Sequence, residues 1–140
     1  MRHHAIDQLR TKAYVHEAAP LTTRDERLRR WAELLRKVGS RPLKPLMWVE
    51  FYSGGQRSRL RRDDSPISVA FADPLMRAAG LPGDTLGDAQ LFFGLSDEQA
   101  HELLCDCHYR GSMTGRSVGH RVRALTGGLG GGFLNWLRSF

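Results

Sequence analysis

Residues 22–39 read TTRDERLRRWAELLRKVG and give the clearest helix signal in the chain. Thr22 and Thr23 precede two acidic residues in the pattern of a capping box, and Gly39 supplies a stop. The acidic residues fall in the first turn, where the helix dipole favours negative charge. Apolar side chains recur at helical spacing along one stripe: Leu28, Trp31, Ala32, Leu35 and Val38. The stretch predicts an amphipathic helix over residues 24–38 with one face on a core.

The same kind of signal recurs near the end of the chain. Ser96-Asp97-Glu98-Gln99 has the residue order of a capping box. It opens an apolar stripe made of Ala100, Leu103, Leu104 and Cys107. After a turn, Thr114 is expected to cap a last core helix, whose inner face carries Val118, Val122 and Leu125.

Shorter segments complete the predicted fold. Residues 67–72, 75–79 and 85–93 are flanked by helix-capping or helix-ending residues and are expected to be short helices. Residues 42–52 give a mixed signal, and a helix opened by proline is favoured there over a short strand. We therefore predict an all-α fold, a compact bundle of about six short helices. Its expected core contains Leu28, Trp31, Leu35, Leu103, Leu104, Val118 and Val122.

Length and composition are those of one globular domain. The chain has 140 residues, of which 41% are hydrophobic and 26% charged, enough to bury a core without disulfides or metals. We assign residues 1–126 to a single helical domain. No apolar run approaches the roughly 20 residues of a membrane span, and the first residues lack the apolar stretch of a secretory signal. With only two cysteines, the chain is expected to be a soluble cytoplasmic protein.

Charge is unevenly distributed along the chain, although the net charge is only +6. Residues 1–62 hold 15 basic and 6 acidic side chains, and residues 63–106 hold one basic and 9 acidic side chains. Residues 107–140 hold 5 arginines and no acidic residue. One interpretation is that these blocks attract each other within the fold. The other is that the basic ends contact an anionic partner such as nucleic acid.

The C-terminal residues 127–140 have a composition of their own. Residues 127–132 contain five glycines, which is typical of a flexible tether. The apolar residues that follow have helical spacing and are assigned as a partner-binding peptide: Phe133, Leu134, Trp136, Leu137 and Phe140. Docking on a protein partner is favoured, and the alternatives are folding back on the domain or contact with a membrane surface.

Basic side chains suggest a nucleic-acid interface as an alternative function. The predicted helices over 97–107 and 114–125 resemble a helix-turn-helix pair, although Gly119 weakens the second helix by about 1 kcal/mol and the turn is long. Ser53-Gly54-Gly55 is expected to break the chain ahead of a second basic segment, a loop. The candidate phosphate contacts are Arg57, Arg59, Arg61, Arg62, Arg116, His120, Arg121 and Arg123. The competing interpretation is an ordinary solvated or internally paired basic surface.

Two histidines and two cysteines lie close together in the sequence. His101, Cys105 and His108 fall at positions i, i+4 and i+7 of the helix predicted over 97–107, a spacing that suits a shared zinc ion. Cys107 is expected to point at the core, so a four-ligand site requires it to turn or a remote histidine to contribute. The favoured interpretation is a buried Cys107 beside an ordinary Cys105, with no metal. A metal site and a redox-active thiol are the alternatives.

No catalytic motif assembles from the sequence, so we expect neither enzymatic activity nor a cofactor. The favoured function is a non-enzymatic adaptor or accessory protein that binds a larger partner through its basic surface and its tethered C-terminal peptide. The rival is a DNA- or RNA-binding regulator. A third hypothesis is a metal- or thiol-dependent sensor. The sequence does not determine the oligomeric state.

Overall fold

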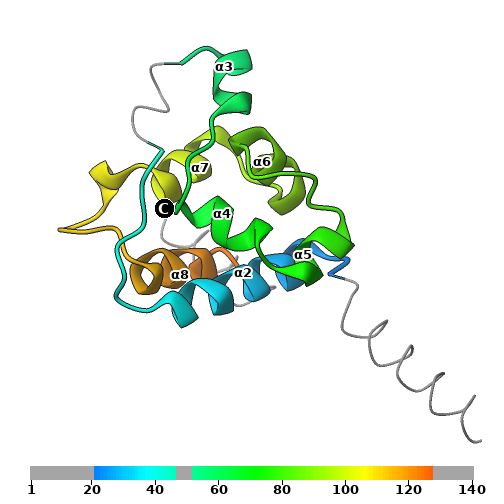
Figure 1. The fold of residues 1–140 in the computed structure, drawn as a ribbon, viewed down its shortest axis with the longest axis horizontal. Helices are drawn as coiled ribbons and strands as arrows, with labels where there is room; N and C mark the ends of the chain where they lie inside the picture. Colours follow the sequence, from blue (N-terminus) through cyan, green and yellow to red (C-terminus); the bar gives the residue numbers. More distant parts are fainter. Residues whose placement is uncertain (1–20, 47–51, 128–140) are drawn as a thin grey trace, which may run out of the picture.

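The computed structural model describes residues 21–46 and 52–127. These residues form seven α-helices and one 3₁₀ helix and contain no β-strand, so the all-α prediction is confirmed. In chain order the elements are α2 (Arg24–Val38), α3 (Gly54–Arg59), α4 (Pro66–Phe71), α5 (Pro74–Ala79), α6 (Leu86–Phe93), α7 (Asp97–Leu104), the 3₁₀ helix η2 (Asp106–His108) and α8 (Gly115–Ala124). Helices α2 and α8 lie side by side, and α6 and α7 lie across the core from α2 (Figure 1).

Short side chains at the helix ends account for most of the helix boundaries. Thr23 accepts a hydrogen bond from the backbone N–H of Glu26 at the start of α2. Ser96 and Thr114 form capping boxes at the starts of α7 and α8. Gly94 follows α6 in a left-handed conformation (φ 62°) that an L-residue rarely adopts. These local signals confirm the helices expected over 24–38, 75–79 and 85–93 within one residue at each end.

Two glycines let α8 approach α2 more closely than other residues would allow. A Cβ atom on Gly115 would lie 2.5 Å from the carbonyl oxygen of Leu35 and 2.6 Å from the Cβ of Val38. A Cβ on Gly119, one turn later, would lie 3.1 Å from the carbonyl oxygen of Ala32. Gly119 was expected to weaken its helix, but in the fold it is buried against α2. The two glycines therefore contribute to packing.

The core is centred on an aromatic pair from α2 and α6. Trp31 stacks on Phe93 with ring centroids 4.2 Å apart and an interplanar angle of 12°. The indole N–H of Trp31 donates a 2.9 Å hydrogen bond to the carbonyl oxygen of Pro66. All seven core residues predicted from the sequence are buried. The core also contains apolar residues of α4, α5 and α6, including Ile67, Met76 and Leu86.

Trp31→Phe tests the hydrogen bond separately from the stacking. Phenylalanine keeps an aromatic ring beside Phe93 but removes the indole donor to the carbonyl oxygen of Pro66. We expect the free energy of unfolding to fall by about 1–3 kcal/mol, the cost of a lost buried hydrogen bond and a smaller ring. Urea unfolding followed by far-UV circular dichroism measures this change. An unchanged midpoint would mean that the indole N–H contributes no net stability.

An ion pair joins α2 to the junction between α4 and α5. Arg30 donates two hydrogen bonds to Asp73, at 3.1 and 2.9 Å. The side chain of Asp73 is 5% exposed and that of Arg30 is 26% exposed. Burial disfavours the charged carboxylate, but the hydrogen bond and positive charge of Arg30 outweigh burial, so the pKa of Asp73 lies below its usual value. Here the basic first part of the chain contacts the acidic middle directly.

The helix favoured over 42–52 is wrong in the part that the structure describes. Residues 41–46 run without helical structure, because neither Pro42 nor Pro45 has an N–H group to donate and each disfavours the helical conformation of the residue before it. The segment crosses the molecule, and three of its backbone N–H groups donate to distant carbonyl oxygens. Leu43 donates to Met113 (2.7 Å), Lys44 to Asp64 (2.8 Å) and Leu46 to Leu104 (2.9 Å). The rest of the expected helix, residues 47–51, lies outside the described residues.

The basic segment after Ser53 is also more ordered than expected. Ser53, expected to break the chain, instead caps α3 through a capping box with Gln56, so Arg57 and Arg59 lie on a helix and not in a loop. Gly87 of α6 packs against this helix, since a Cβ there would lie 2.6 Å from the carbonyl oxygen of Ser58.

Parts of the sequence-based assignment fall outside the described residues. No helix within residues 21–46 and 52–127 has the length and hydropathy that a bilayer crossing requires. The single domain assigned over 1–126 and the tether over 127–140 stay predictions, because residues 1–20 and 128–140 are not described. The assigned partner-binding side chains lie in the last segment: Phe133, Leu134, Trp136, Leu137 and Phe140.

Candidate functional site

Three of the predicted phosphate contacts lie together on the outer face of α8. Arg116, His120 and Arg123 are exposed, because the opposite face of the helix buries Val118 and Val122. Together with an arginine of α2 they line a cleft of about 250 Å³, which we call the basic cleft: Arg36, Arg116, His120 and Arg123. The cleft follows the line along which α8 packs on α2.

A larger cavity adjoins the basic cleft and shares Arg116 and His120 with it. It has a volume of about 560 Å³, and its other lining residues include His108, Tyr109 and Arg110. Four arginines of these two cavities take part in no ion pair within the described part of the chain. They are Arg36, Arg110, Arg116 and Arg123. The two cavities together form a surface on which positive charge is not neutralised by acidic side chains.

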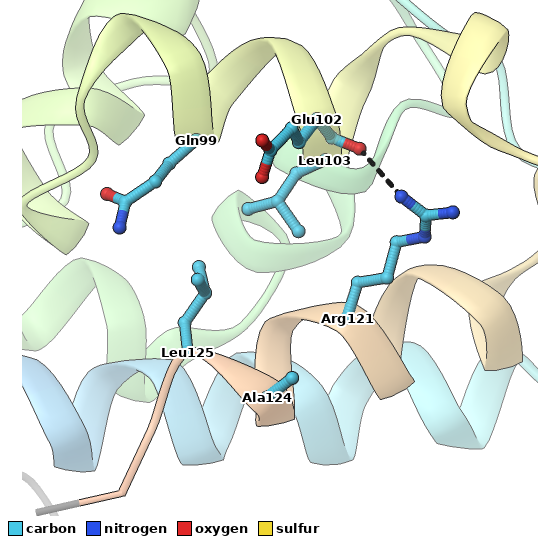
Figure 2. Close-up of a pocket in the computed structure, with 6 residues that line it drawn as sticks. All are labelled: Gln99, Glu102, Leu103, Arg121, Ala124 and Leu125. Atoms are coloured by element: carbon cyan, nitrogen blue, oxygen red, sulfur yellow. Dashed lines mark hydrogen bonds between the residues drawn. The ribbon is translucent and has the colours of Figure 1, made fainter. Parts of the chain in front are cut away.

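Arg121 lies beside these residues in the sequence but has a different environment. Figure 2 shows its side chain directed from α8 towards α7, where Nη1 lies 3.4 Å from the carbonyl oxygen of Glu102. Its Nη2 donates to the carbonyl oxygen of His108, and its guanidinium lies 4.1 Å from the centroid of the Tyr109 ring. Arg121 therefore holds the segment that follows α7 in place, and it also lines the larger cavity beside Arg116 and His120.

Tyr109 is the other anchor of this segment. Its hydroxyl donates a 2.7 Å hydrogen bond to the carbonyl oxygen of Leu103. Burial raises the pKa of Tyr109 well above its ordinary range, although the charge of Arg121 opposes this effect. The phenol is therefore neutral at physiological pH and acts as a hydrogen-bond donor.

The predicted basic segment around α3 is largely engaged in ion pairs. Arg57 lies 3.4 Å from Asp97, and Arg61 lies 3.0 Å from Asp84. The hydrogen bond from Arg61 lowers the pKa of Asp84 below its usual value, which keeps this carboxylate charged. The other two residues of the segment behave differently: Arg62 donates to the carbonyl oxygen of Pro45, and Arg59 is exposed. These ion pairs join the basic first part of the chain to its acidic middle. They agree with the interpretation that the charge blocks attract each other within the fold.

The predicted helix over 97–107 ends early, and this rearranges the cysteines. Helix α7 stops at Leu104, and Cys105 has an extended conformation (φ −94°, ψ 131°). Cys105 is therefore the buried thiol, at 3% exposed, and Cys107 is exposed. The sequence-based assignment of a core-facing Cys107 is wrong, because helical spacing no longer holds beyond residue 104.

The end of α7 and η2 bring both histidines and both cysteines together. The sulfur atoms of Cys105 and Cys107 lie 2.7 Å apart, and no disulfide joins them. The sulfur of Cys107 lies 3.7 Å from Nε2 of His101, and Nε2 of His108 lies 2.8 Å from Nδ1 of His101. One ligand atom each from His101, Cys107 and His108 lie within 4.8 Å of one another, a separation that a metal ion can bridge. We call these four side chains the His/Cys cluster.

Sequence reasoning missed Arg36, and the assignment of Arg121 as a phosphate contact stays a prediction. Arg36 lies on α2, far from α8 in the sequence, and joins the basic cleft because Gly119 allows α2 to lie against α8. The available signal was the four-residue spacing of Gly115 and Gly119, which is typical of a closely packed helix pair. No protein-family model matches the chain, and comparisons with curated proteins and with solved structures found no match.

Proposed function

We propose that the protein binds nucleic acid by holding its phosphate backbone in the basic cleft. The observation that supports this proposal is the grouping of Arg36, Arg116 and Arg123 on one exposed surface without an acidic partner among the described residues. Guanidinium groups suit this ligand because each forms paired, charge-assisted hydrogen bonds with phosphate oxygens.

The binding mode that we propose differs from a helix-turn-helix. Helices α7 and α8 are separated by residues 105–114, which include η2, and the space between the two helices is lined by Leu103 and Leu125 (Figure 2). The basic cleft is formed by α8 with α2 instead. Contacts from such a cleft position the protein on phosphates and do not read base edges, so the proposal is binding with little sequence preference.

The tail-mediated adaptor function and the nucleic-acid function are not exclusive. The adaptor hypothesis depends on residues 128–140, which lie outside the described residues, and it stays a prediction from the sequence. The nucleic-acid proposal depends only on α2 and α8, so the two can be tested separately.

Arg116→Ala combined with Arg123→Ala is expected to lower affinity for labelled duplex DNA or single-stranded RNA more than tenfold. Three arginines that neutralise three phosphates give a salt slope of about −2.7, so wild-type affinity should fall about forty-fold between about 50 and 200 mM salt. The double variant should reduce this slope by about 2. Fluorescence anisotropy titrations measure both quantities, and the two probes show which nucleic acid is preferred.

The matched control removes the same charge elsewhere. Arg57→Ala combined with Arg61→Ala also subtracts two positive charges, but from arginines that already pair with acidic side chains. We expect this control to change affinity less than threefold. If both double variants weaken binding equally, net charge alone is responsible and the basic cleft is not the binding site. Binding of the wild type that does not change with salt would also contradict the proposal.

A further inference from the structure

The geometry points to a structural zinc site in the His/Cys cluster, formed by His101, Cys105, Cys107 and His108. The ligands come from two elements in succession: His101 lies in the last turn of α7, and the others lie at its end and in η2. All four belong to a segment of eight residues, so the site is local and lies entirely within the described part of the chain. This inference is independent of the proposed nucleic-acid binding.

One pair of the ligand atoms already has the separation found in a zinc site. With usual zinc–sulfur and zinc–nitrogen bond lengths, neighbouring ligand atoms of a tetrahedron lie about 3.3–3.8 Å apart. The 3.7 Å separation between Cys107 Sγ and His101 Nε2 falls in this range. His108 contributes a third ligand atom within 4.8 Å of the other two. Because His108 now contacts Nδ1 of His101 and not the Nε2 that lies near Cys107, its imidazole has to shift for all three side chains to bind one ion.

Cys105 completes the coordination shell as the fourth ligand. Its sulfur lies next to that of Cys107, and the separation of 2.7 Å has to widen to about 3.8 Å for both to bind one zinc ion. The exposed Cys107 can make this adjustment, since its side chain is not packed in the core. Four protein ligands close the site to water, which is the arrangement of a structural zinc ion and not of a catalytic one.

The donor atoms select zinc over the common hard cations. Thiolate and imidazole ligands suit Zn²⁺, whereas Mg²⁺ and Ca²⁺ prefer carboxylate and carbonyl oxygens. Each thiol loses its proton as the metal binds, so affinity rises with pH across the range in which free thiols are protonated.

Neighbouring residues hold the segment that carries the ligands. Arg121 donates to the carbonyl oxygens of Glu102 and His108, one on each side of the cysteines. Tyr109 is anchored by its hydrogen bond to Leu103. Such outer contacts orient metal ligands in known sites, and their loss typically weakens metal binding 10–100-fold. Arg121 is therefore a positioning residue for the zinc site.

A zinc ion at this position would stabilise the connection between α7 and α8. Residues 105–114 join α7 to α8 with only the three-residue η2 as regular structure. His108 and Tyr109 of this connection also line the cavity that adjoins the basic cleft. A zinc ion bound to His108 fixes this wall of the cavity to the end of α7.

Titration of the full-length chain with Co²⁺, followed by displacement with Zn²⁺, tests the site directly. We expect one Co²⁺ per chain, a thiolate-to-cobalt charge-transfer band and the intense visible bands of tetrahedral cobalt, all of which Zn²⁺ abolishes. Cys107→Ser and His101→Ala should each lower affinity at least about a hundredfold, and Arg121→Ala about 10–100-fold. The chain is prepared without a histidine tag, so that added histidines do not bind the probe.

The controls concern histidines outside the cluster. His120→Ala, and the pair His3→Ala with His4→Ala, should leave the cobalt spectrum and stoichiometry unchanged. Circular dichroism of each variant shows whether it remains folded. Absence of the charge-transfer band in the folded wild type overturns the inference, as does the weak visible spectrum of octahedral cobalt. A spectrum that persists in the Cys107→Ser and His101→Ala variants places the metal elsewhere and also overturns it.

Discussion

Gly115→Val is expected to destabilise the fold by about 3 kcal/mol, at the upper end of the cost of overpacking. Even the Cβ atom of the new side chain would overlap the carbonyl oxygen of Leu35, at 2.5 Å, and the Cβ of Val38, at 2.6 Å. The first of these is a backbone atom inside α2 and cannot rotate away. Relief therefore requires α8 to move from α2, which opens the most extensive contact between helices in the described fold. Thermal unfolding should show a midpoint lowered by on the order of 10 °C.

Two other glycine variants serve as graded controls. Gly119→Ala has a looser fit, with 3.1 Å to the carbonyl oxygen of Ala32, and gains up to about 1 kcal/mol of helix propensity. The loss of stability in Gly119→Ala should therefore lie between zero and the loss in Gly115→Val. Gly55→Ala in α3 places its Cβ in open space and should be neutral or slightly stabilising. Equal stability of Gly115→Val and the wild type would show that α8 does not approach α2 this closely.

Asp73→Ala is expected to lower the free energy of unfolding at neutral pH by about 3 kcal/mol, the lower end of the cost of breaking a buried ion pair. The variant leaves the half-buried side chain of Arg30 without its carboxylate. Because the pKa of Asp73 is lowered in the folded state, its contribution is present above the ordinary pKa of 3.8. This contribution to stability is lost as the pH falls from 3.8 to below the lower pKa that Asp73 has in the folded state. The difference between variant and wild type should therefore shrink below pH 4.

Asp84→Ala provides a matched comparison for burial. Asp84 also accepts two hydrogen bonds from one arginine, at 3.1 and 3.0 Å, but Arg61 is exposed. We expect a much smaller loss of stability for this pair, because water screens it. Urea unfolding at pH 7 and at pH 3 measures both variants. A deficit in Asp73→Ala that stays constant between these two pH values would show that lost packing, not charge, is responsible.

Local chemistry explains which parts of the fold were predictable. The limits of α2, α5 and α6 follow from caps, glycines and apolar spacing that lie within a few residues of each helix, and these were predicted closely. Helix α3 was missed because two glycines after Ser53 were interpreted as a break, although the Ser53–Gln56 capping box offsets their low helix propensity. Residues 41–46 are not helical because Pro42 and Pro45 interrupt them, a local signal that was underweighted. The distant segments to which they bond are not revealed by any local pattern.

The candidate sites show the same limit at the level of single side chains. Helical spacing correctly grouped Arg116, His120 and Arg123, because all three lie on one uninterrupted helix. The same spacing predicted a buried Cys107, whereas Cys105 is the buried cysteine. The prediction failed because the helix ends between His101 and the cysteines. Where the backbone leaves the helix, spacing identified the right cluster of residues but not the direction of each side chain.

The pairing of α2 with α8 also has a consequence for the order of folding. These two helices are the first and the last in the described residues, so their contact closes a long loop and contributes a large sequence separation. During synthesis, the apolar side of α2 cannot pack on α8 until residues 115–124 have left the ribosome. Until this helix emerges, the face of α2 that packs on α8 stays exposed on the nascent chain, which favours aggregation.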